Sequence, residues 1–98
     1  MSPDLLLTSA LNDSTPPENL SPELHVLWLA KAGQWHQSHD IAQNLPDPNG
    51  SWLHAYLHRL EGDDGNASYW YHRANKPTPP QTRSLDDEWF QLARHFCK

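Results

Sequence analysis

The feature that most constrains this 98-residue chain is an internal repeat, in which the segment from Leu24 aligns with the segment from Leu53. Gly33 then falls on Gly62, and each glycine is followed by four small, apolar or aromatic residues at positions i, i+3, i+4 and i+7. The four are Ser38, Ile41, Ala42 and Leu45 in the first copy, and Ala67, Trp70, Tyr71 and Ala74 in the second. Because this spacing is that of one helix face, the repeat predicts two helical hairpins that turn at the glycines.

The stripe also assigns the aromatic cluster YWYHR, residues 69–73, to packing rather than to an exposed site. Trp70 and Tyr71 lie on the stripe and are expected in the core, because residues at i+3 and i+4 share one helix face. Tyr69, His72 and Arg73 are expected to point away from it.

Capping signals place the ends of the predicted helices. Ser21 followed by Pro22 is typical of a helix start, and Gly33 can take the left-handed conformation that ends a helix. Ser51 or a neighbour, Asp63 or Asp64, and Ser84 are the N-caps expected for later helices. The predicted helices span about 22–32, 35–45, 51–61, 65–75 and 85–96.

The chain is long enough for one domain with a modest core. We expect a single helical domain over 21–98, with repeat units at about 22–48 and 51–77 and a C-terminal capping helix over about 85–96. A proline-rich linker, 76–83, precedes that helix. Residues 1–20 are predicted to be an arm that is partly disordered or forms a short helix over about 4–11.

Charge and composition exclude several classes of function. The net charge is −5 and the seven Lys and Arg residues are dispersed, so neither nucleic acid nor an anionic membrane is an expected partner. The first 21 residues have no Lys or Arg and only a three-leucine apolar run, unlike a signal peptide. With a single cysteine, Cys97, no intrachain disulfide can form. We expect a cytoplasmic protein without a cofactor.

The second unit, EGDDGNASYWYHRA, resembles the tetratricopeptide repeat. It has a turn glycine (Gly62), a small residue five positions on (Ala67), an aromatic nine on (Tyr71) and an alanine twelve on (Ala74), with Pro77 near the closing proline. The first unit matches less fully, and the period of 29 is shorter than the family's 34. The resemblance implies an all-α, right-handed stack of two antiparallel hairpins, closed by the C-terminal helix.

The resemblance also implies a non-catalytic module that binds a peptide or partner segment in a groove lined by the first helix of each unit. Mapped by position from the glycines, the groove residues are Leu27, Lys31, Trp52, Tyr56 and Arg59. An alternative interpretation stays open, because Trp52 and Tyr56 adjoin three leucines, Leu53, Leu57 and Leu60, that form a core stripe. On that interpretation the two rings are buried and bind nothing.

Seven histidines suggest a second class of function. His54 and His58 stand at i and i+4, a spacing at which one helix face can hold a zinc ion, and His36 and His39 stand at i and i+3. The segment lacks the glutamate of H-E-x-x-H, so these histidines are weak candidates for a metal site.

No feature of the chain predicts catalysis. No serine or cysteine lies in a recognisable nucleophile turn, and no two of the four glycines are adjacent, so a phosphate-binding loop is absent. We therefore expect a protein that is not an enzyme. A third possibility is a self-associating structural protein, with Tyr69 or Phe90 in a homodimer contact.

Overall fold

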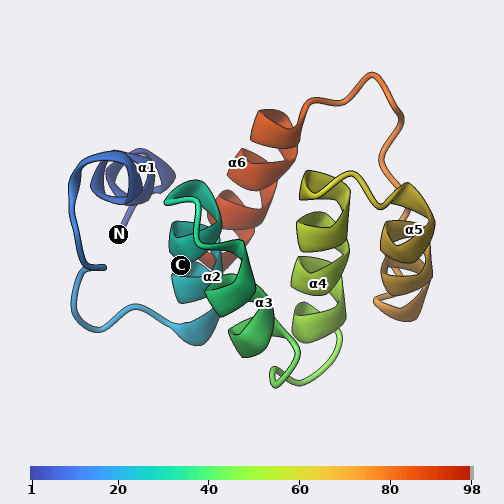
Figure 1. Cartoon of the computed structure of the whole chain (residues 1–98), viewed down its shortest axis with the longest axis horizontal. Coiled ribbons are helices and arrows are strands. Elements are labelled where there is room, and N and C mark those ends of the chain that lie inside the picture. Colours follow the sequence, from blue (N-terminus) through green and yellow to red (C-terminus); the bar gives the residue numbers. More distant parts are fainter. Residues whose placement is uncertain (98) are drawn as a thin grey trace.

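The computed structural model describes residues 1–97, and Lys98, the last residue of the predicted domain, lies outside the described residues. These 97 residues contain six α-helices and no strand, which confirms the all-α prediction (Figure 1). The helices are α1 (Pro3–Asn12), α2 (Pro22–Lys31), α3 (Trp35–Ala42), α4 (Asn49–Leu60), α5 (Asp64–Arg73) and α6 (Leu85–Phe96).

Serine caps begin three of these helices. The side chains of Ser2, Ser21 and Ser84 each accept a hydrogen bond from a backbone N–H three residues later, at the starts of α1, α2 and α6. Such a cap satisfies one of the first-turn N–H groups that have no partner inside the helix. The prediction of a helix near residues 4–11 is confirmed by α1.

The two interhelix turns at the glycines have the same backbone hydrogen bonds, displaced by 29 residues. Gly33 and Gly62 have φ angles of 80° and 89°, in the left-handed region that favours glycine. Each glycine N–H donates to the carbonyl three residues earlier, and each following N–H donates to the carbonyl five residues earlier. This is the Schellman arrangement of a helix end. The repeat seen in the sequence is therefore a repeat of backbone structure.

The repeat stripe is buried in both copies at its first position, i, and at i+4, while i+3 is half-buried. Ser38, Ala42, Ala67 and Tyr71 are all buried, whereas Trp70 is half-buried and Tyr69 is exposed. Small residues at the start of each stripe allow neighbouring helices to approach closely. The aromatic cluster of α5 is thus mainly packing, with Tyr71 as its fully buried member.

The predicted bounds of two helices were wrong. The second predicted helix ends at Ala42 rather than near 45, because the N–H groups of Asn44 and Leu45 bond to carbonyls only three residues back. The third begins at Asn49, not after Ser51; Ser51 is buried inside the first turn, and its hydroxyl donates to the carboxylate of Asp47. Tight backbone turns therefore set the first boundary, and local side-chain bonding accompanies the second.

The core lies where α2, α4 and α6 meet (Figure 1). Leu27, Leu53, Leu57, Trp89 and Leu92 are fully buried there. The indole N–H of Trp89 on α6 donates to the Leu27 carbonyl oxygen on α2, at 3.0 Å. Since this bond joins residues 62 positions apart, α6 is an integral part of the domain and not a detached tail.

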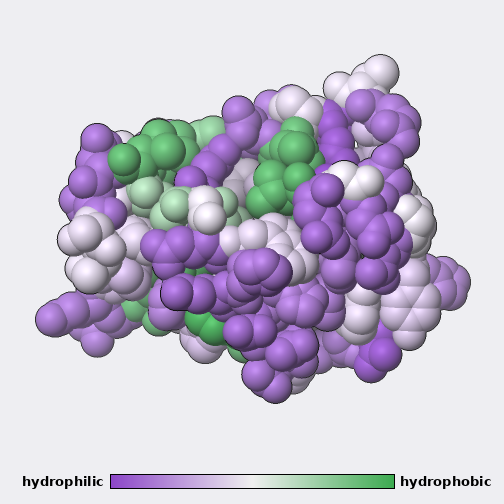
Figure 2. Space-filling view, in the orientation of Figure 1, coloured by the Kyte–Doolittle hydropathy of each residue, from purple (hydrophilic) through white to green (hydrophobic). Residues whose placement is uncertain are grey.

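At the other end, α1 packs on α2 through Leu6, which is fully buried. Figure 2 shows apolar surface gathered over α1, a helix on which Leu5 and Leu11 are exposed, while most of the rest of this face is hydrophilic. None of the helices within residues 1–97 combines the length and apolar character needed to cross a membrane.

Candidate metal centre

Three histidines converge where α3 passes α4. His54 and His58 lie one turn apart on α4, and His39 comes from α3. One ring nitrogen from each can be chosen so that all three lie within 4.8 Å of one another. His54 and His58 are buried and His39 is half-buried. The i, i+4 spacing predicted the pair on α4, and the packing of the two hairpins supplies the third imidazole.

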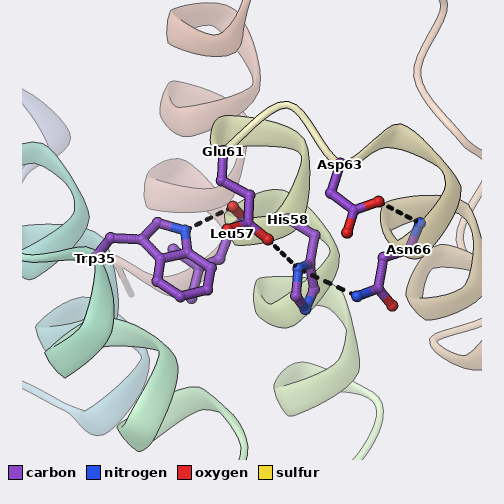
Figure 3. Close-up of polar contacts among 6 residues, drawn as sticks. All are labelled: Trp35, Leu57, His58, Glu61, Asp63 and Asn66. Carbon is purple, nitrogen blue, oxygen red and sulfur yellow. Dashed lines mark hydrogen bonds and ion pairs between the residues drawn. The ribbon is translucent and has the colours of Figure 1, made fainter.

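Two tryptophans enclose the histidines. Trp35 stacks on His39 with ring centroids 4.8 Å apart, and Trp70 of α5 stacks on His54 at 3.9 Å. The indole N–H of Trp35 donates to the Leu57 carbonyl oxygen at 2.7 Å, which fixes that wall against α4 (Figure 3). The centre is thus a partly buried cluster of aromatic rings contributed by three helices.

A carboxylate orients His58. Its Nδ1 lies 2.8 Å from Oε1 of Glu61, three residues later on the same chain, and 3.5 Å from the side-chain amide of Asn66 (Figure 3). An ionised carboxylate only accepts hydrogen bonds, so Nδ1 donates to Glu61, and Nε2 is the ring nitrogen that this contact leaves unused. A histidine held in this way by a carboxylate is the usual outer-shell arrangement around protein-bound metals.

His39 and His54 are without hydrogen bonds among the described residues, and burial favours the neutral form of both rings. Burial lowers the pKa of His54 to about 4, with further lowering from His39, His58 and Arg73. Burial, followed by repulsion from His58, also lowers the pKa of His39, despite the opposing effects of Asp40 and Glu61. Neutral imidazole is the form that binds a metal ion, so no proton has to leave either ring at neutral pH.

Metal binding would require the rings to close in. Zinc–nitrogen bonds of about 2.0–2.1 Å place ligand nitrogens roughly 3.4 Å apart, closer than the 4.8 Å limit that encloses the three here. His54 and His58 are stacked with an interplanar angle of 18°, so at least one ring must turn to aim its lone pair at a shared ion. His39 already approaches His54 edge-on, with ring centroids 4.3 Å apart.

A second potential ligand group combines His58 with Glu61 and Asp63. Both carboxylates are exposed, and Asp63 already accepts from the backbone N–H of Asn66 as the N-cap of α5 (Figure 3). Glu61 is likewise engaged with His58. These acids are explained by capping and by orientation of the imidazole, so the three-histidine centre is the stronger candidate.

The predicted groove residues are placed differently. Leu27, Trp52 and Tyr56 are buried, while Lys31 pairs with Asp86 and Arg59 pairs with Glu88, both on α6. The face expected to be a groove is therefore covered by α6 of the same chain, and the alternative interpretation of Trp52 and Tyr56 as core residues is the one that the burial supports.

Other predicted candidates are not brought together with the centre. His36 is exposed and contacts only the edge of Trp35 among the rings, at 5.3 Å, so it stands outside the cluster. Of the residues suggested for self-association, Tyr69 is exposed and Phe90 is half-buried. The sequence analysis did not predict the contacts that Trp35, Trp70 and Glu61 make with the histidines. For Glu61 the sequence offered a signal, because it stands three residues after His58.

Comparison with known proteins does not assign the chain: no family model, no curated protein and no solved structure matches it. The resemblance to the tetratricopeptide repeat and the handedness of the hairpin stack stay predictions. Function is therefore argued from the centre itself.

Proposed function

We propose that this protein binds a divalent transition-metal ion, with zinc as the expected ion, through His39, His54 and His58. The observation that carries the proposal is the convergence of three mostly buried imidazoles, two of them without hydrogen-bond partners. Because His39 and His54 make no hydrogen bond among the described residues, their ring nitrogens are available as ligands. A shared metal ion would use them together with His58.

The donor set favours zinc among the ions that imidazole binds. Copper binds nitrogen ligands more tightly, but it prefers a tetragonal arrangement. Zinc has no such electronic preference and accepts three histidines with a fourth position left to another ligand. Glu61 supports metal binding in general, because its contact with Nδ1 of His58 orients the ring and leaves Nε2 unused.

The interaction function implied by the tetratricopeptide resemblance receives less support. A peptide in the predicted groove would have to displace α6, since Trp89 bonds to Leu27 and the ring of Phe96 lies 5.9 Å from that of Trp52. No contact of the described residues favours self-association or catalysis over metal binding. Metal binding is therefore the function that the geometry supports best.

The proposal is tested by zinc titration of the full chain after chelator treatment. An ion that binds only the folded state at about 100 times its dissociation constant adds roughly 2.7 kcal/mol to the free energy of unfolding. For a domain of this size, that corresponds to a rise in melting temperature of roughly 10–20 °C. Isothermal calorimetry should give one zinc per chain.

His54→Ala and His39→Ala should each abolish this thermal shift, whereas His36→Ala should keep it, because His36 lies outside the cluster. His36→Ala is thus the matched control for a surface histidine. An unchanged melting temperature in saturating zinc, or an equal shift in His36→Ala and His54→Ala, would exclude the centre.

A further inference from the structure

A cavity of about 330 Å³ lies beside the metal centre, between the end of α3, the start of α4 and α5. Its wall includes the charged residues Asp47 and Arg73, the hydroxyl of Ser51, and the rings of His54 and Trp70. A volume of this size is at the lower end of the range for small-molecule sites. The cavity combines polar groups with the apolar surface of Trp70.

His54 belongs both to this cavity and to the metal centre. Its side chain is 6% exposed and makes no hydrogen bond within residues 1–97. A zinc ion held by three histidines keeps at least one coordination position for a further ligand. That ligand can come from the cavity, because His54 lines both spaces.

The charged groups of the cavity are unequally engaged. The carboxylate of Asp47 accepts from the Ser51 hydroxyl and lies 3.4 Å from Nε of Arg73. Arg73 has five N–H donors in all, its guanidinium lies 5.4 Å from the centre of the Trp70 ring, and about half of the side chain is exposed. Arg73 is also hydrogen-bonded to the Tyr69 side chain, but its five N–H donors are not all used by Asp47 and Tyr69, so this wall offers donors from a cation.

A bound dication would make the cavity strongly electropositive, because the Asp47–Arg73 pair alone is neutral. We infer that a small organic carboxylate binds there as an external ligand of the metal, with one oxygen on the ion and the other on Arg73. The inference rests on the metal centre proposed above. Guanidinium and carboxylate match in shape and charge, and Trp70 can contact the apolar part of the acid.

Cobalt(II) tests the inference, because it replaces zinc in nitrogen sites and its visible absorption reports the coordination of the ion. The full chain is loaded with cobalt and titrated with sodium propionate, with inorganic phosphate in a parallel arm. Propionate should change the spectrum with saturation, and Arg73→Gln should weaken its binding roughly tenfold, as expected for loss of a charge-assisted hydrogen bond. Phosphate should change the spectrum less at equal concentration.

Arg94→Gln is the matched control, since Arg94 is an exposed arginine on α6 and does not line the cavity. It should bind propionate like the parent, and all three proteins should bind cobalt equally. A cobalt spectrum that propionate leaves unchanged, or equal propionate affinity in Arg73→Gln and the parent, would overturn the inference and leave the metal centre standing. Absence of any cobalt spectrum would overturn both.

Discussion

Acidification should destabilise the metal-free protein, and His54 determines most of the effect. In the unfolded chain its pKa is the ordinary 6.5, whereas in the folded protein burial, His39, His58 and Arg73 lower it to about 4. Between these values the unfolded state binds more protons, so the free energy of unfolding falls as the pH falls. The loss begins near pH 6.5 and levels off below about pH 4.

The size of the loss follows from the same two pKa values. Going from pH 7 to pH 5, this one group should cost about 2 kcal/mol, because each pKa unit is worth about 1.4 kcal/mol and the folded state stays unprotonated over this range. His39 adds to the loss, since its pKa is also lowered. The melting temperature should fall by roughly 8–16 °C.

The assay is thermal unfolding followed by circular dichroism in the presence of a chelator, for the parent and for His54→Gln. Glutamine does not titrate, so the variant should lose about 2 kcal/mol less stability than the parent between pH 7 and pH 5, whatever its stability at pH 7. Equal pH dependence in the two proteins would refute the reasoning, because it would show that His54 is solvated and titrates normally in the folded state.

Two substitutions test the packing around the centre and under α6. Ala55→Leu should lower the free energy of unfolding by about 1–3 kcal/mol, because Ala55 on α4 is fully buried and a larger side chain overpacks the core. Urea denaturation measures this change. A variant as stable as the parent would show that α4 does not approach its neighbours closely at this position. Glu88→Ala should lower the free energy of unfolding by roughly 3–5 kcal/mol, because the Glu88 side chain is buried and pairs with Arg59 at 2.9 Å. Glu88→Gln keeps a hydrogen-bond acceptor and should lower it less. Equal losses of stability in the two variants would contradict the charge argument.

The sequence predicted well those parts of the fold that local bonding determines. The turns at Gly33 and Gly62 need a left-handed residue and a helix on each side, and both requirements are readable within about ten residues. The start of α4 was missed because Ser51 looks like an N-cap, while its hydroxyl bonds backwards to Asp47. Short polar side chains have several local partners, so their role at a helix end is not decided by identity alone.

The candidate site was predicted only in part, for a different physical reason. The i, i+4 spacing identified His54 and His58, and His39 was named together with His36, which lies outside the cluster. What the sequence could not supply was the crossing of α3 and α4 that places His39 against His54, at 4.3 Å between ring centroids. That crossing depends on contacts between hairpins, which periodicity within one helix does not specify.

The predicted groove was misplaced for the same reason, because contacts between helices that are far apart in the sequence decide which face is covered. Two hairpins alone would leave the apolar face of α2 and α4 open to water, and two repeat units are fewer than the three that such arrays usually need. In this chain α6 covers that face with Trp89 and Leu92, both fully buried. Glu88 then becomes buried between Arg59 and Tyr71, accepting from both. Because α6 completes the core in this way, the face at which a repeat protein would hold a peptide is used for stability, and the opposite face of α4, with His54 and His58, is the one that we propose binds a ligand.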